Sequence, residues 1–365
     1  MSNFYPVYPT VGLELTFIPN KPGKWKEFLV KREAIEVAAE FNSKLRRSSI
    51  LRRVRHAYGL GSRHLFTAKA DPFRSFFAQG PTPPHESWCI EINNTPLKFN
   101  AMLVEGDCLC PSHRYEDALY ELYDTATALQ LYPHIEEKRK NGTVIDYPTG
   151  GGHLHLSTNF WTRGWEYLYR LNLLEEAWCC DYVNYPLIRW LFAQWSDDIN
   201  SRAGLSPKRL NKERKRINPA EPNSSIPGIY ARYFMDECSA IEARMAHNEK
   251  SVYPTYEFRF FDMPRNPKEL LHQIHFLGRW TKFHMDKIEE RVKIDVSTTN
   301  PANQITATSS YFWKLARNQS FAKEQLSSFF TTLGLDAAPY LAIWWERNYQ
   351  RRMNFGKPFT ENFSR

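Results

Sequence analysis

The sequence predicts an α+β fold whose strands form an antiparallel sheet. Short segments with the pattern of strands are scattered among longer helical segments, without the regular alternation of a doubly wound parallel sheet. Aromatic residues make up 15% of the 365 residues, and side chains of this size can fill a substantial core. The length is compatible with one elaborated domain or with two.

Four segments have the residue pattern of strands. Residues 10–18 alternate Val, Leu, Leu and Phe with Gly, Glu and Thr, as a half-buried strand does. Residues 149–160 begin with a glycine turn and then place two histidines and a serine on one face, with leucines on the other. The remaining two predicted strands are 88–92 and 253–262.

Apolar residues at intervals of three and four predict the helices. The helical segments are 24–58, 114–132, 165–196, 267–292 and 310–350. A loop is expected at residues 70–86, which contain four prolines, and a mobile insertion at 201–229, which are basic and then rich in Pro and Ser.

The predicted strands carry ionisable residues on the face opposite their apolar side chains. These residues are Glu14, Glu91, His153, His155, Glu257 and Arg259. Carboxylates and imidazoles on one face of a sheet need partners, and a mixture of this kind suits Mg²⁺ or Mn²⁺. The planar fork of an arginine suits phosphate. Each signal also has a plain structural interpretation: a solvated glutamate, a histidine bonded to backbone, or a cross-strand ion pair.

The order of these residues resembles the motifs of glutamine synthetase and of the amidoligases. Residues Gly12 to Phe17 resemble the Gly-x-Glu-x-Glu-Phe strand that opens the active site in that superfamily. Residues 91–96 are similar to its Glu-x-x-x-x-Pro segment, and 150–157 to its glycine turn followed by His-x-His-x-Ser. Residues 256–267 look like its late Glu-Phe-Arg strand and the Asn-Pro that begins the next helix.

The resemblance implies a fold and a set of roles. The fold would be a curved antiparallel sheet of the glutamine synthetase catalytic type, with helices on its outer face and helical insertions. By resemblance, the metal ligands are Glu14, Glu91, His153 and Glu257. The nucleotide contacts are His155, Ser157 and Arg259, and the catalytic residues are Arg259 and Glu257.

One residue departs from the family pattern. The second glutamate of the opening strand is Thr16 here, so one metal ligand of the family is missing. Either fewer metals bind, or another carboxylate supplies the oxygen, for which Glu105, Asp107 and Asp262 are the candidates. The loss also fits a diverged scaffold without catalysis.

The expected domain organisation follows from the extent of the motifs. Residues 1–295 would form the catalytic domain, with insertions at about 100–145 and 160–250. Residues 296–365 would form a helical C-terminal segment packed on this core.

The function that the resemblance implies is an ATP- and Mg²⁺- or Mn²⁺-dependent carboxylate–amine ligase, an enzyme that forms an amide or peptide bond through an acyl phosphate. Its partners would be a small-molecule or peptide carboxylate and an amine. A homo-oligomer is compatible with the family. Two alternatives remain: a non-catalytic scaffold that binds nucleic acid or an acidic partner, and a metal-dependent hydrolase.

Charge and cysteine content bear on partners and location. The net charge is +8, and two basic runs, 46–63 and 208–216, could each contact nucleic acid. Alternatively, the first run forms a solvated helix face and the second a loop that closes over ATP. The six cysteines do not form a disulfide framework, although Cys108, Cys110 and His113 leave a zinc site open. With no signal peptide or membrane span in the pattern, a cytoplasmic location and no membrane partner are expected.

Overall fold

A computed structural model of the chain describes residues 9–19, 29–72, 88–98, 114–138, 144–148, 152–157, 241–244, 255–258, 263–294 and 318–344, with the single residues 170, 174, 177, 178 and 261. The chain forms two compact units. The first unit comprises Thr10–Leu156 and Phe261–Ile274. The second comprises Met1–Pro9, Ser157–Phe260 and His275–Arg365.

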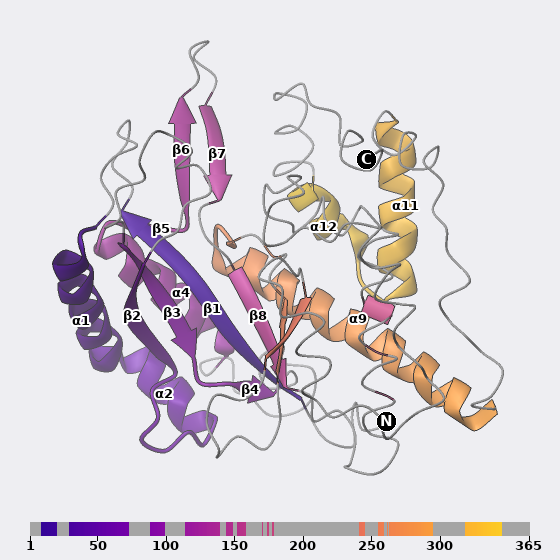
Figure 1. Cartoon of the computed structure of the whole chain (residues 1–365), viewed down its shortest axis with the longest axis horizontal. Coiled ribbons are helices and arrows are strands. Elements are labelled where there is room, and N and C mark those ends of the chain that lie inside the picture. The colour runs from indigo at the N-terminus through magenta and orange to yellow at the C-terminus, as the bar shows by residue number, and fades with distance from the viewer. Residues whose placement is uncertain are drawn as a thin grey trace. The chain divides into compact units, whose positions relative to one another are not determined.

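The first unit is built on an antiparallel sheet with the strand order β2-β3-β1-β8 (Figure 1). The strands are β1 (Thr10–Pro19), β2 (Phe66–Pro72), β3 (Trp88–Asn94), β4 (Leu97–Lys98), β5 (Leu131–Tyr132) and β8 (Gly152–Ser157). The short strands β4 and β5 each pair with β1. A separate hairpin pairs β6 (His134–Lys138) with β7 (Val144–Pro148).

Side chains alternate between the two faces of this sheet. In β1, Val11, Leu13, Leu15 and Phe17 are buried, and the even-numbered residues between them are half-buried. The same alternation holds in β8, where every second residue is buried. One face of the sheet is therefore apolar and the other is polar, because successive side chains point to opposite sides of a strand.

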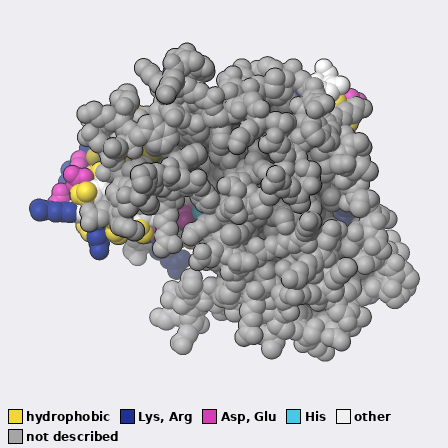
Figure 2. All heavy atoms as spheres, turned by 45° about the horizontal axis from the view of Figure 1, so that its top comes forward, with side chains coloured by type: hydrophobic (Ala, Val, Ile, Leu, Met, Phe, Trp, Pro, Cys, Tyr) yellow, Lys and Arg dark blue, Asp and Glu magenta, His cyan; other side chains and the backbone are white. Residues whose placement is uncertain are grey.

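Three helices supply the apolar side chains that cover the buried face (Figure 1). They are α1 (Lys31–Arg47), α2 (Ser49–Ala57) and α4 (Tyr115–Ala128). Residues at helical spacing form their inner stripes, such as Ala34, Ala38, Phe41 and Leu45 in α1. The outer side of α1 carries the charges, and Lys, Arg, Asp and Glu side chains gather at the left edge of the face drawn in Figure 2, on the side of α1.

A buried asparagine links the sheet to α4. The Asn94 side chain accepts a hydrogen bond from the backbone N–H of Leu13 at 2.6 Å and donates one to the Tyr115 hydroxyl at 3.3 Å. Asn94 is 8% exposed, so these two hydrogen bonds replace the ones that its side chain would otherwise make to water. This contact holds the middle of β1 against β3, in the stretch that carries Glu14.

The second unit contains an antiparallel strand pair and an aromatic core. Its elements are β9 (Ile241–Arg244), β10 (Thr255–Phe258), most of α9 (Pro267–Ile294), α11 (Gln319–Thr332) and α12 (Ala337–Trp344). Trp178 packs edge-on against Tyr256 and Phe258 of β10, with ring centroids 5.3 and 4.9 Å apart. Trp280 of α9 contacts the same cluster and stacks on Phe276 at 5.3 Å.

The prediction of an α+β fold with an antiparallel sheet is confirmed in the described residues. The strands expected near residues 10–18 and 88–92 are present, as are the helices expected at 114–132 and 267–292. The helical segment expected over 24–58 is present from Lys31 to Ala57, but as two helices, because Ser48 separates α1 from α2. Its hydroxyl accepts the backbone N–H of Leu51 at 3.2 Å, which caps α2.

Six strands of the described residues were not predicted from the sequence: β2, β4, β5, β6, β7 and β9. Residues 70–72 of the expected loop are strand instead, since β2 continues to Pro72, and residues 73–86 lie outside the described residues. The helix expected at 165–196 and the insertion at 201–229 lie almost entirely outside the described residues. The domain boundary at residue 295 stays a prediction. Within the described part of the chain, no helix has the length and apolar character needed to cross a membrane.

Candidate active site

The polar face of the first unit's sheet gathers ionisable residues from neighbouring strands. The register places Glu14 of β1 opposite His153 of β8 and opposite Asn93 of β3. The same register pairs Gly12 with His155. Directly opposed residues share a face in an antiparallel pair, so these polar side chains all point to one side.

Glu14 lies between the two histidines. Its Oε1 atom is 3.4 Å from Nδ1 of His153, and its Oε2 atom is 3.3 Å from Nε2 of His155. The side chains are 28% exposed for Glu14, 13% for His153 and 25% for His155, so the group is sheltered but reachable from solvent. Each carboxylate oxygen therefore faces one imidazole.

Glycine at position 12 leaves room for this arrangement. A Cβ atom at Gly12 would lie 3.3 Å from the Cβ of His155. That separation is tighter than an ordinary van der Waals contact, so a larger residue would displace the histidine. Gly12 therefore permits the close approach of β1 and β8 that brings Glu14 and His155 together.

The environment favours the charged form of Glu14. Burial raises the pKa of this carboxyl, but hydrogen bonds and positive charge from His153 and His155 lower it more, and the net pKa lies well below its ordinary value. Glu14 is consequently anionic throughout the range in which proteins are handled. An anionic carboxylate beside imidazole nitrogen atoms is a donor set that divalent cations bind.

A second carboxylate, Glu91 of β3, occupies the same face in a different setting. It is 6% exposed, and its Oε1 atom accepts hydrogen bonds from Nζ of Lys69 at 2.6 Å and from Nδ2 of Asn93 at 2.9 Å. Burial and the charge of Glu14 raise the pKa of Glu91, and the bonds from Lys69 and Asn93 lower it by less. The pair itself is favourable, because Glu91 raises the pKa of Lys69 despite the burial of that ammonium group.

Replacing Glu91 with Gln is expected to stabilise the metal-free protein at neutral pH. The raised pKa means that folding disfavours the ionised carboxylate, a penalty that appears as the pH rises through 4.5, the ordinary value, and persists above the folded-state pKa. The variant should melt about 1–3 °C higher than wild type at pH 7 in EDTA. Differential scanning calorimetry should show this advantage shrinking below pH 4.5. A lower melting temperature at pH 7 would mean that the Lys69 ion pair dominates instead.

The donor spacing around Glu14 fits a bound cation. Two ligand atoms about 2.1 Å from one ion and at right angles lie about 3 Å apart. The Glu14–His155 separation of 3.3 Å is close to this value. A simple carboxylate–imidazole hydrogen bond gives a similar separation, so a metal titration distinguishes the two.

The other predicted site residues belong to the second unit or are not described. Glu257 lies on β10 and is 2% exposed, and Ser157 is the half-buried last residue of β8. Arg259 and two proposed substitutes for the missing glutamate, Glu105 and Asp107, lie outside the described residues. The third substitute, Asp262, also lies outside them, as do Cys108, Cys110 and His113. Thr16 faces Glu91 in the register of β1 and β3.

Sequence reasoning missed two residues of the polar face, Lys69 and Asn93. The signal for Lys69 was present, because in β2 the buried Phe66 and Ala68 alternate with the exposed Thr67 and Lys69. The predicted loop at 70–86 takes in only the last three residues of β2, and no strand was predicted for residues 66–69. No signal in the sequence pointed to Asn93. Its part in the site is visible only from the hydrogen bond that it donates to Glu91, two residues earlier on the same face.

Comparisons with known proteins add a structural neighbour of low similarity. No protein-family model matches the chain, and no curated protein matches it. One similar solved chain belongs to the crystal structure of the complex between prokaryotic ubiquitin-like protein Pup and its ligase PafA. The identity is 10% and the TM-score 0.32, with 98% of this chain and 67% of that chain covered. At these values the likeness carries no argument about this protein's activity.

Proposed function

We propose that this protein is an ATP-dependent carboxylate–amine ligase that forms an amide or peptide bond. The observation that carries the proposal is the position of Glu14 between His153 and His155. These residues come from two of the four segments that resemble amidoligase motifs. A third segment contributes Glu91 to the same face of the sheet.

The proposed reaction requires an anionic, sheltered site. A carboxylate is a poor acyl donor, and phosphoryl transfer from ATP with a divalent cation converts it to an acyl phosphate that an amine can attack. The residues of the site must therefore hold the cation and orient the phosphate groups, and the site must keep water from the activated acid. A face with both carboxylates and imidazoles is suited to the first of these tasks.

The proposed roles follow the resemblance. Glu14, Glu91, His153 and Glu257 would hold the metal, His155 and Ser157 would contact the nucleotide, and Arg259 would bind the transferred phosphate. Glu14 and His155 face each other in the structure and offer one carboxylate and one imidazole. Under the proposal, His155 would serve the metal, the nucleotide or both.

The donor set favours Mn²⁺ over Mg²⁺. Mg²⁺ prefers oxygen ligands almost entirely, whereas Mn²⁺ accepts imidazole nitrogen more readily. With Thr16 in place of a second glutamate, β1 contributes one carboxylate to the face rather than two. Both ions should support binding of ATP, with Mn²⁺ effective at the lower concentration.

The first experiment is a thermal-shift titration of the full chain with Mn²⁺, with ATP and with both. The ligase proposal predicts that the pair stabilises the protein more than either component does. At 100 times the dissociation constant the stabilisation is about 2.7 kcal/mol. Glu257→Gln, which preserves size and removes the charge, should abolish the additional shift.

Each outcome separates the proposal from its alternatives. Stabilisation by metal alone, with no further effect of ATP, would favour a metal-dependent hydrolase built on His153, His155 and the glutamates. No stabilisation at millimolar concentrations of metal and ATP would contradict the ligase and favour a diverged scaffold. A positive result would be followed by measuring ADP release with pairs of small or peptide acids and amines.

A further inference from the structure

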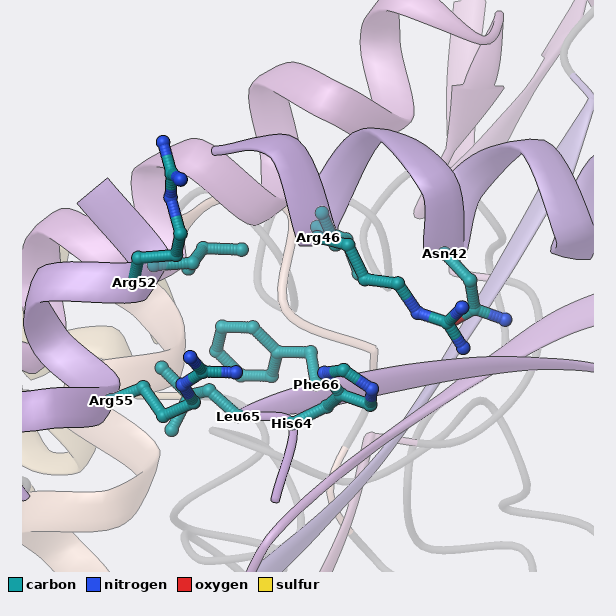
Figure 3. A pocket seen from close by; sticks show the side chains of 9 residues that line it. Asn42, Arg46, Arg52, Arg55, His64, Leu65 and Phe66 are labelled. Carbon is teal, nitrogen blue, oxygen red and sulfur yellow. The ribbon is translucent and has the colours of Figure 1, made fainter. Parts of the chain in front are cut away.

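A basic pocket lies in the first unit between α1, α2 and the start of β2 (Figure 3). It is a hollow that opens to solvent, with about 350 Å³ of empty space when the open solvent in front of it is included. Arg46 extends from α1, Arg52 and Arg55 from α2, and His64 from the chain that enters β2 (Figure 3). Leu65 and Phe66 form its apolar floor, and no acidic residue lines it.

The pocket belongs to the most basic stretch of the described chain. Residues 41–70 contain eight Lys and Arg residues and no Asp or Glu. This excess equals the net charge of +8 of the whole protein, so the rest of the chain is balanced. The described part of the chain thus has a marked excess of positive charge around this concave site.

The arginines of the pocket have no counter-charge among the described residues. Elsewhere on α1 the basic side chains have acidic neighbours, as in the Arg32–Glu36 pair at 2.9 Å. Neither Arg46, Arg52 nor Arg55 forms an ion pair with a carboxylate in the described part of the chain. Guanidinium groups around one hollow repel each other, and a bound anion would remove that repulsion.

Helix-end electrostatics explain only part of this cluster. Arg46 and Arg47 lie in the last turn of α1 and Arg55 in the last turn of α2, where cations interact favourably with the helix dipole. Arg52 and Arg53 lie in the middle of α2, where the dipole gives them no favourable interaction. The dipole also does not account for the absence of acidic residues over residues 41–70.

We infer that this pocket binds the phosphodiester backbone of a nucleic acid, independently of base sequence. The planar fork of arginine matches phosphate oxygens. Exposed Arg47, Arg53 and Arg63, each next in sequence to a lining residue, extend the charge beyond the pocket, as a polyanion requires. Bases are not read, because Phe66 is 3% exposed and Tyr58 packs against Tyr115 instead of offering a free ring. This inference is independent of the proposed ligase activity.

The test is fluorescence anisotropy of the full chain with labelled 20-nucleotide single strands of two unrelated sequences, at several KCl concentrations. The variant replaces Arg46, Arg52 and Arg55 with Gln. It should bind both strands at least tenfold more weakly than wild type. The slope of log affinity against log salt concentration should be smaller in magnitude by about 2 for the variant, since each lost phosphate contact contributes about 0.7 to this slope.

A charge-matched control separates the pocket from the overall charge. Arg32, Lys268 and Lys323 are exposed basic residues outside this stretch, and replacing all three with Gln removes the same charge. This control should stay within about twofold of wild-type affinity. Circular dichroism and melting temperature should show that both variants fold.

Three results would overturn the inference. One is the absence of binding by wild type at low salt. A second is equal weakening in the pocket variant and the control, which would assign binding to net charge alone. The third is displacement of the oligonucleotide by polyglutamate as effectively as by an unlabelled strand of equal charge, which would identify the surface as a site for an acidic peptide.

Discussion

Replacing Glu14 with Gln is expected to abolish the stabilisation of the protein by Mn²⁺ with ATP. Gln keeps the shape of the side chain but removes the charge, and its amide cannot accept at both ends as the carboxylate does toward His153 and His155. Affinity for Mn²⁺ should fall by about 100-fold or more, since losing even a supporting partner of a metal ligand costs about 10- to 100-fold. Isothermal titration with Mn²⁺ and the thermal shift with ATP both measure this loss.

The same substitution should weaken the metal-free protein, with a defined dependence on pH. The lowered pKa of Glu14 means that its carboxylate stabilises the fold at pH values above the ordinary value of 4.5. The expected loss at neutral pH is about 1–2 kcal/mol, the range for a buried hydrogen bond to a charged group. The difference between variant and wild type should shrink as the pH falls below 4.5, where wild type loses the same contribution.

Glu36→Gln is the matched control. Glu36 lies on α1 and pairs with Arg32, but its side chain is 63% exposed, so its loss should change neither metal affinity nor stability appreciably. If Glu14→Gln bound Mn²⁺ and ATP as tightly as wild type, the polar face would not be the metal site. The proposed function would then lose the observation on which it rests.

Replacing Trp280 with Ala is expected to destabilise the second unit by about 3–5 kcal/mol. Trp280 is fully buried and contacts Trp178, Phe258 and Phe276, with ring centroids between 5.3 and 6.3 Å. Removing the indole leaves a cavity among rings that are too large to collapse into it. The loss is measurable by urea denaturation followed by tryptophan fluorescence.

The cluster also positions β10, so the substitution should have a functional consequence. Phe258 is the neighbour of Glu257 in the chain and packs on both Trp178 and Trp280. Under the proposed function, a loosened β10 weakens metal binding even at temperatures where the variant remains folded. Trp280→Phe, which keeps a ring in place, should lose less than half as much stability. A loss below about 1 kcal/mol for Trp280→Ala would show that the cluster is not a core of this unit.

Local sequence determined which residues of each strand share a face. In β1 and β8 the alternation of apolar and polar residues is complete, so Glu14, His153 and His155 were predicted on polar faces before any pairing was known. This works because the two-residue period of a strand depends only on backbone geometry. The same kind of pattern was present in β2, but no strand was predicted there, so Lys69 was missed.

Local sequence was less reliable for helix boundaries. Residues 24–58 contain an uninterrupted helical spacing of apolar residues, yet Ser48 ends one helix and begins another. A serine competes for backbone N–H groups, and whether it caps or continues a helix depends on where the following turn packs. That break places Arg46 and Arg52 on two different helices, which is how the basic run came to line a pocket instead of one solvated face.

Tertiary structure alone decided which polar faces meet. His155 lies 141 residues after Glu14, and nothing between them in the sequence specifies that β8 pairs with β1 in the register that opposes Glu14 to His153. The register follows from burying Leu13, Leu15, Leu154 and Leu156 on the same side of the sheet, since a shift of β8 by one residue would turn Leu154 and Leu156 to the polar face. The Lys69–Glu91 contact arose in the same way, from the pairing of β2 with β3. The sequence by itself therefore determined which polar residues each strand presents on one face. The burial of the apolar face determined which of these residues come together in one site.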